Sequence, residues 1–307
     1  MTCGNEPIVL ALPGNEVLAA DLVSALGAEP GRLTLHRFPD QEICVRVVTP
    51  VAGRDVVLVC ALDRPNDKLV KLYLAASTLR SLGARRVLLV APYLPYMRQD
   101  SSFHAGEGVS ALYIGRWLSD FLDGLVTVDP HLHRTRNLHE IYRMPAIIVH
   151  SAAAIARWIR DNVSRPMMLV GPDAESRQWI ERVAREVPCD YLVLDKVRLG
   201  DHDVELRPPT SPLKQDRAAV LVDDIISTGG TMLAAIRRLR ADGFDAPICI
   251  GVHALFIDDA YRCLRRSGAQ NIVTCNTIPH ASNAIDLHRW LAPAVRELLA
   301  QPPQPGR

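Results

Sequence analysis

The chain has 307 residues, of which 48% are hydrophobic and only 5% aromatic, and its formal net charge is +1. The length suggests about two domains, and the aliphatic composition favours an α/β protein with buried parallel strands. A net charge this close to zero excludes a global field that would attract nucleic acid or a membrane surface, so we expect neither as a partner.

The seven cysteines are scattered, and none forms a C-x-x-C pair. Several stand inside apolar, strand-like runs, which favours buried reduced thiols and a cytoplasmic location. The N-terminus lacks a basic segment followed by a long apolar stretch, and no window approaches the roughly 18 apolar residues of a membrane span. We therefore expect neither a signal sequence nor a membrane-spanning helix.

Strand-like and helix-like segments alternate along the chain. In chain order, strands are expected at Ile8–Leu12, Asp55–Cys60, Arg86–Ala91, Gly124–Val128, Met167–Val170, Asp190–Asp195, Ala218–Val222, Ile248–Val252 and Asn271–Thr274. Helices are expected between them at Glu16–Leu26, Lys68–Leu82, Val109–Phe121, Ala152–Asn162, Ser176–Glu186 and Met232–Asp242. This alternation is typical of βαβ units with parallel sheets.

Two stretches of the chain resemble each other. Val56–Val59 is followed by a helix and then Leu82–Val90, and Val220–Val222 is followed by a helix and then Asp242–Ile250. Either a duplication or a coincidence between two βαβ units explains this. We expect an N-terminal domain over residues 1–147 and a C-terminal domain over residues 148–307, whose last helix either stays with it or returns to the N-terminal domain.

The strand Ala218–Val222 leads into the clearest candidate site. Two carboxylates, Asp223 and Asp224, end the strand, and after two isoleucines the segment Ser227-Thr228-Gly229-Gly230-Thr231 leads into a helix. Glycines let backbone N–H groups approach a phosphate, hydroxyls add donors, and a helix N-terminus favours negative charge. The carboxylates can accept hydrogen bonds from vicinal sugar hydroxyls at the sheet edge where α/β proteins bind ligands. We predict a site for a ribose 5-phosphate; the alternative is an ordinary Gly-Gly turn with a threonine cap.

This string resembles the phosphoribosyl-diphosphate (PRPP) motif of type I phosphoribosyltransferases and ribose-phosphate pyrophosphokinases. Further segments resemble only the second family, in the family's order, from residue 8 to about 298. They are Arg37–Glu42 (R-F-x-D-G-E), Asn66-Asp67, Pro92–Asp100 (P-Y-x-x-Y-x-R-Q-D), Asp129–His131 (D-x-H), Gly171–Ala174, Lys196–Arg198 (K-x-R) and Val273–Pro279. The segment from Arg98 to Ser110 looks closer to the archaeal-type enzymes than to the allosteric bacterial type.

The resemblance implies two tandem type I phosphoribosyltransferase-like domains, each a mainly parallel sheet flanked by helices. It implies a ribose-phosphate diphosphokinase that transfers the diphosphoryl group of ATP to O1 of ribose 5-phosphate, giving PRPP and AMP, with Mg²⁺ as cofactor. It also implies a homo-oligomer, because the adenine loop would reach in from a neighbouring subunit.

The family's site residues carry over as follows. ATP would be bound by Phe38, Asp40, Gln41, Glu42, Arg98, Gln99 and Asp100. Ribose 5-phosphate would be bound by Arg198, Asp223, Asp224, Ser227, Thr228, Gly229, Gly230 and Thr231. Lys196 and Arg198 would stabilise the transferring phosphoryl group, and His131 and Asp173 would each bind a metal ion.

Simpler interpretations remain for several of these residues. Phe38 could be a core residue, Lys196 and Arg198 surface charges, and Asp173 a helix cap. Histidine is an unusual Mg²⁺ ligand, so His131 could be structural, and a zinc site with the nearby His133 and His139 is a further alternative. At the level of the protein, the alternatives are a non-catalytic regulatory subunit and a phosphoribosyltransferase.

The sequence departs from the family pattern in four places. Ser227 stands where an acidic residue is usual, and Gln41 stands where the adenine loop has glycine. Glu175 adds a carboxylate beside the second expected metal ligand, and Ser101-Ser102 replaces basic residues. We expect weaker ribose 5-phosphate binding from the first and an altered loop backbone from the second.

Overall fold

The computed structural model describes residues 6–102, 104–132, 137–194, 196–198, 204–206 and 217–303, the two short segments by their backbone alone. The chain divides into two compact units. The N-terminal unit comprises Met1–Val149 and His288–Arg307, and the C-terminal unit comprises His150–Leu287. The division thus falls two residues beyond the predicted boundary, and the last helix, α8 (His288–Ala300), belongs to the N-terminal unit.

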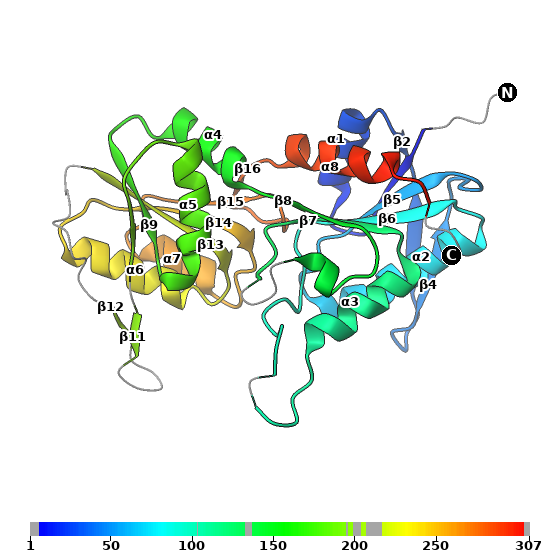
Figure 1. Cartoon of the computed structure of the whole chain (residues 1–307), viewed down its shortest axis with the longest axis horizontal. Coiled ribbons are helices and arrows are strands. Elements are labelled where there is room, and N and C mark those ends of the chain that lie inside the picture. Colours follow the sequence, from blue (N-terminus) through cyan, green and yellow to red (C-terminus); the bar gives the residue numbers. More distant parts are fainter. Residues whose placement is uncertain are drawn as a thin grey trace. The chain divides into compact units, whose positions relative to one another are not determined.

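The N-terminal unit is built on a parallel sheet with the strand order β2-β1-β5-β6-β7-β8. The strands are β1 (Ile8–Ala11), β2 (Glu29–Pro30), β5 (Asp55–Val59), β6 (Arg86–Ala91), β7 (Gly124–Val128) and β8 (Ala146–Val149). Helices α1 (Glu16–Leu26) and α8 cover one face, and α2 (Pro65–Ser81) and α3 (Ser110–Phe121) cover the other (Figure 1). Every residue of β5, β6 and β7 is buried, as expected of a parallel sheet covered on both faces.

The C-terminal unit has a second parallel sheet, with the order β10-β9-β13-β14-β15-β16. Its strands are β9 (Met167–Gly171), β10 (Tyr191–Val193), β13 (Ala218–Ile226), β14 (Ile248–Ala254), β15 (Asn271–Cys275) and β16 (Asn283–Ile285). Its helices are α4 (Ala152–Asn162), α5 (Arg177–Glu186), α6 (Gly230–Ala241) and α7 (Ala260–Arg266). The predicted class, two tandem domains with parallel sheets flanked by helices, is confirmed.

The two sheets share one topology. In both, the first strand pairs with the second at the sheet edge, an antiparallel hairpin follows, and the remaining four strands continue in chain order. The hairpins are β3 (Leu33–Arg37) with β4 (Ile43–Val47), and β11 (Lys196–Arg198) with β12 (Val204–Leu206). The repeat seen in the sequence is β5–α2–β6 and β13–α6–β14, which occupy the same place in the two strand orders.

The helices after the last strands also correspond. Helix α4 follows β8 but belongs to the C-terminal unit, where it packs on α5. Helix α8 follows β16 but belongs to the N-terminal unit, where it packs on α1. Each unit therefore receives one of its helices from the chain segment that follows the sheet of the other unit.

Two remaining sequence expectations concern the whole chain. Within the described ranges, no helix is long and apolar enough to cross a membrane. The six cysteines of the described part are free thiols, and three of them, Cys60, Cys249 and Cys275, are buried.

Candidate active site

The predicted phosphate loop lies between β13 and α6. The strand is four residues longer than predicted and includes Asp223 and Asp224, so the connection shrinks to Ser227–Gly229. Gly229 has φ +77°, a left-handed backbone that glycine adopts without strain, and its carbonyl accepts the bond from Leu233 N at 2.8 Å. The first N–H groups of a helix lack intrahelical acceptors, so the N-terminus of α6 can receive an anion.

Backbone hydrogen bonds fix the start of the loop, and there is space beside its last glycine. The carbonyls of Ile226 and Ser227 accept bonds from the backbone N–H groups of Phe256 and Ile257, at 2.9 and 3.1 Å. A Cβ built on Gly230 would find only Thr228 Oγ1 within 4 Å, at 3.9 Å. The backbone is therefore fixed to the segment after β14, while space remains beside Gly230. Nothing in the sequence pointed to the Phe256–Ile257 segment as the support.

The carboxylates of the loop strand differ in exposure. Asp224 is buried at 3% exposure, and its Oδ1 accepts from Ile225 N at 2.8 Å. Asp223 is half-buried, and its Oδ1 accepts from Asp224 N at 3.0 Å. Asp223 is accordingly the more accessible of the two to a sugar hydroxyl.

Asp173 follows β9 at the same carboxyl edge of the sheet. It is the N-cap of the 3₁₀ turn η2 (Ala174–Ser176): its Oδ1 accepts from Glu175 N at 3.1 Å and from Ser176 N at 3.2 Å. The capping interpretation is thus correct, and a carboxylate with two oxygens can cap and still bind a metal ion. Gly171 leaves room for the Ser176 side chain, because a Cβ at position 171 would overlap Ser176 Oγ. Sequence reasoning treated Gly171 only as part of a motif.

Lys196 and Arg198 lie on β11, which pairs with β12. In the backbone register, Lys196 is opposite Leu206 and Arg198 is opposite Val204. Their side chains lie outside the described part of the chain. The hairpin occupies the position in the C-terminal unit that β3 and β4 occupy in the N-terminal unit.

The β3–β4 hairpin carries the expected adenine residues. Phe38 and Glu42 close the turn through the bond from Phe38 N to the Glu42 carbonyl at 2.8 Å, and Asp40 Oδ1 accepts from Glu42 N at 3.1 Å. Phe38 is 42% exposed and meets His36 edge to face at 4.7 Å. The simpler interpretation of Phe38 as a core residue therefore does not hold, and the ring is accessible for stacking.

Gln41 keeps the backbone that glycine would favour. Its φ is +77°, and its Oε1 accepts from Arg37 Nη1 at 2.7 Å. Arg37 also pairs with Asp67 of α2 at 3.2 Å, and Asp67 pairs with Lys71 at 2.7 Å. The Gln41 side chain thus joins a polar chain that links the hairpin to α2, and the effect of Gln41 on the loop backbone stays a prediction.

The segment after β6 carries Arg98, Gln99 and Asp100. Gln99 is tied to α3, since Ser110 Oγ donates to its Oε1 at 2.7 Å and Ala111 N to its carbonyl at 3.3 Å. Arg98 is exposed and makes no ion pair with any residue in the described ranges. Asp100 is half-buried. An exposed, unpaired guanidinium at the carboxyl edge of a parallel sheet is suited to a phosphate.

His131 follows β7 at this edge and is partly exposed. The preceding Asp129 is buried, has φ +32°, and donates its N–H to the Val149 carbonyl at 3.1 Å. Of the other histidines in the zinc alternative, His139 lies in the turn η1 (Leu138–Glu140), and His133 lies outside the described residues.

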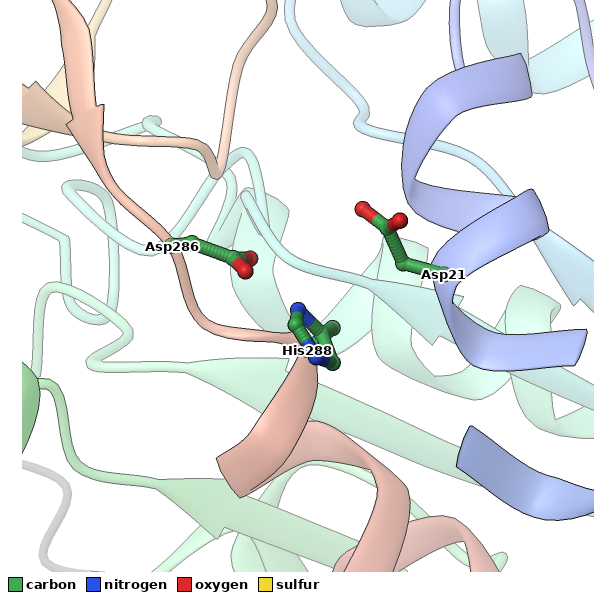
Figure 2. A group of neighbouring side chains, drawn as sticks. All are labelled: Asp21, Asp286 and His288. Atoms are coloured by element: carbon green, nitrogen blue, oxygen red, sulfur yellow. The ribbon is translucent and has the colours of Figure 1, made fainter. Parts of the chain in front are cut away.

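Side chains of metal-ligand type also occur outside the predicted site. Figure 2 shows Asp21 on α1 and His288 at the start of α8, two helices that pack together in the N-terminal unit. Asp286, also drawn, belongs to the C-terminal unit, where its Oδ1 accepts from Asn276 at 2.8 Å. None of the three was predicted as a site residue, and we assign them no role in catalysis.

The fold and the loop define a protein with two phosphoribosyltransferase-like units. The family model for the N-terminal domain of ribose phosphate pyrophosphokinase matches residues 8–121, and the phosphoribosyl transferase domain model matches residues 137–289. The chain belongs to the ribose-phosphate pyrophosphokinase family.

Individual relatives agree with this assignment. The chain is 34% identical to the ribose-phosphate pyrophosphokinase of Methanopyrus kandleri over 95% of its own length and 99% of the relative's. It is 33% identical to that of Sulfolobus acidocaldarius over 81% and 86%. Both organisms are archaea, in line with the predicted archaeal resemblance. The crystal structure of phosphoribosylpyrophosphate synthetase from Mycobacterium smegmatis has the same fold, with a TM-score of 0.84 over 96% of this chain and 99% of that one, at 24% identity.

Proposed function

We propose that the protein transfers the diphosphoryl group of ATP to O1 of ribose 5-phosphate, giving PRPP and AMP. The observation that carries this proposal is family membership over nearly the whole chain, since the matched relatives are ribose-phosphate pyrophosphokinases. The phosphoribosyltransferase alternative does not account for the N-terminal unit.

The C-terminal unit supplies the acceptor half of the reaction. The 5-phosphate binds at Ser227–Thr231, where the left-handed Gly229 and the N-terminus of α6 present N–H groups. Asp223 and Asp224 bind the ribose hydroxyls, with Asp223 the more exposed. Arg198 adds a positive charge to this half.

The N-terminal unit supplies the ATP half. Phe38 stacks on adenine, and Asp40, Gln41 and Glu42 of the same hairpin turn contact the adenine as well. Arg98 and Gln99 bind the phosphates and the base, with Asp100 beside them. The exposure of Phe38 and Arg98 supports these roles.

Phosphoryl transfer depends on positioning and on charge neutralisation more than on covalent catalysis. Lys196 and Arg198 would stabilise the charge that spreads over the transferring group. Mg²⁺ is the proposed cofactor: His131 would hold one ion and Asp173 a second, and the bound ions would neutralise phosphate charge. The carboxylate of Asp173 suits this hard cation, whereas a histidine ligand is less usual.

Product identity tests the proposal. We expect the purified protein with Mg²⁺ to release AMP, and not ADP, in equal amount to PRPP and only when ribose 5-phosphate is present. Lys196→Ala should lower kcat by about 100-fold or more, because it removes a donor to the developing charge. Arg157→Ala, an exposed arginine on α4, serves as the matched charge-removal control.

Failure of the wild-type protein to release AMP in response to ribose 5-phosphate would refute the reaction. If Lys196→Ala were as active as the control Arg157→Ala, the role of Lys196 would be refuted, but the proposed reaction would not. Removal of Mg²⁺ with a chelator should abolish the reaction, and re-addition should restore it.

We also propose a cytoplasmic homo-oligomer in which the β3–β4 hairpin serves the ATP site of a neighbouring subunit. The free thiols support the reducing location, and the exposed Phe38 supports a role outside its own core. A fully active monomer in sedimentation analysis would contradict the shared site.

A further inference from the structure

A cavity of about 330 Å³ opens at the amino ends of β9 and β13, within the C-terminal unit. Its wall includes Pro166 and Met167 at the start of β9 and Arg217 just before β13. The phosphate loop follows the opposite end of β13, a strand of nine residues that spans about 30 Å at ~3.3 Å per residue. The cavity is thus separate from the proposed ribose site.

The cavity combines an apolar wall with guanidinium groups. Its apolar lining includes Ile159 of α4, Val163 directly after that helix, Met167 and Val187. Its volume lies at the lower end of the range in which small-molecule sites occur, and such sites join apolar walls with a few placed polar groups. The space suits a small ligand with an apolar body.

Three arginines line the same cavity. Arg165 pairs with Asp245 at 2.7 Å, and Arg217 pairs with Asp190 at 2.5 Å, but both carboxylates are about two-thirds exposed (69% and 66%) and neither lines the cavity. Exposed pairs of this kind contribute little and rearrange readily.

Arg160 is the third arginine of the cavity, and it differs from the other two in its partner. Its Nη1 donates to the Glu186 carbonyl at 3.1 Å, and no carboxylate in the described part of the chain lies within ion-pair distance of it. Among the described residues, three guanidinium groups and two paired carboxylates leave one arginine at the cavity without an ion pair. Guanidinium groups bind carboxylate and phosphate oxygens in matched pairs of hydrogen bonds.

We propose that this cavity is a second binding site, for a small organic anion whose carboxylate or phosphate group meets Arg160 and Arg217 and whose apolar body packs on Met167 and Val187. The site is remote from the proposed reaction, so its ligand need not be a substrate or product.

Cys189 offers a local reporter, because this partly exposed thiol lines the cavity. Burial raises the pKa of Cys189, so alkylation by iodoacetamide is best followed at about pH 9. Phenyl phosphate and benzoate are expected to slow the alkylation of Cys189 saturably, as measured by peptide mass spectrometry. Cys263, exposed on α7 and outside the cavity, should react at an unchanged rate.

Substitution tests the arginine contribution. Arg160→Ala should raise the half-protecting concentration about tenfold, whereas Arg157→Ala on the same helix should leave it unchanged. Inorganic phosphate, which lacks the apolar body, should protect at least tenfold less well than phenyl phosphate, and the order of phenyl phosphate and benzoate shows which anion the arginines prefer.

Three results would overturn the proposal: no saturable protection of Cys189 in the wild-type protein, equal protection of Cys263, or protection unaffected by Arg160→Ala. Equal protection by inorganic phosphate and phenyl phosphate would refute the apolar part of the site. The wild-type measurement requires no variant to fold, and it reports on this cavity even if the phosphate loop binds the same probe.

Discussion

Asp55, the first residue of β5, is nearly buried between two arginines. Arg85 contacts its two oxygens at 2.7 and 2.6 Å, and Arg86 contacts them at 3.1 and 2.5 Å. Burial raises the pKa of Asp55, but the hydrogen bonds and charges of Arg85 and Arg86 outweigh it and hold the pKa below its ordinary value of 3.8. The folded protein therefore favours the ionised form.

Asp55→Asn is expected to destabilise the protein near neutral pH by about 3–5 kcal/mol, because the buried Arg86 loses its counter-charge. A lowered folded-state pKa contributes stability that is present above 3.8 and is lost as the pH falls through the folded value. The difference between wild type and variant in denaturant unfolding should therefore shrink below about pH 3.8. An equal difference near pH 7 and near pH 3 would contradict this linkage.

The sequence could not indicate this pair of contacts. Asp55 and Arg86 were only the first residues of predicted strands, and Arg85 preceded one. Their contacts depend on the parallel pairing of β5 with β6, in which Asp55 is the register partner of Arg86. By contrast, Gly229 and the carboxylates of the phosphate loop were identifiable, because a local backbone requirement and a local motif coincide there.

At the scale of elements, the connection from β9 to η2 packs tightly against Gly171, which has no Cβ. A Cβ at Gly171 would lie 2.3 Å from Ser176 Oγ and 3.2 Å from Ile180 Cγ1. Ser176 Oγ also donates to the Asp173 carbonyl at 2.5 Å, so displacement of Ser176 disturbs the cap that orients Asp173.

Gly171→Ala is accordingly expected to cost about 1–3 kcal/mol of stability through overpacking, and to raise the Mg²⁺ concentration needed for half-maximal activity. In a Ser176→Ala background, which removes the hydroxyl that would clash, the same change should cost less. A double-mutant cycle from denaturant unfolding measures the difference. Additive effects would show that Ser176 Oγ is not the atom that excludes a side chain at position 171.

Sequence periodicity located the buried elements well and the exposed ones poorly. The predicted bounds of β6, β7, α1 and α4 are those of the structure. The β3–β4 and β11–β12 hairpins were not predicted as strands, and the exposed, alternating residues of β3 and β4 explain why an apolar run was not visible there. Strand β13 was cut short because Asp223 and Asp224 interrupt its apolar pattern.

At the scale of the whole molecule, helix α8 follows the C-terminal sheet in the chain but packs in the N-terminal unit. Helix α8 packs on α1, β7 and β8, and Arg86 donates to three backbone carbonyls at its C-terminal end, those of Leu298, Leu299 and Gln301. Gly124 of β7 has room for Leu298, because a Cβ there would lie 3.1 Å from Leu298 Cδ1. The sequence left this helix open between two units, since an amphipathic pattern shows that a helix is buried but does not name its partner.

Leu298→Ala should therefore weaken the N-terminal unit although the residue lies near the end of the chain. Loss of a buried leucine costs about 2–5 kcal/mol, and the matched variant Leu239→Ala removes a leucine that is likewise buried from α6 of the C-terminal unit. Hydrogen exchange followed by mass spectrometry should show faster exchange in α1, β7 and β8 for Leu298→Ala, and in β13 and β14 for Leu239→Ala. If Leu298→Ala accelerated exchange only in β13–β16, α8 would pack on the C-terminal unit, and its assignment to the N-terminal unit would be contradicted. Because both leucines are buried, a difference in where exchange becomes faster would be caused by local packing and not by position in the chain.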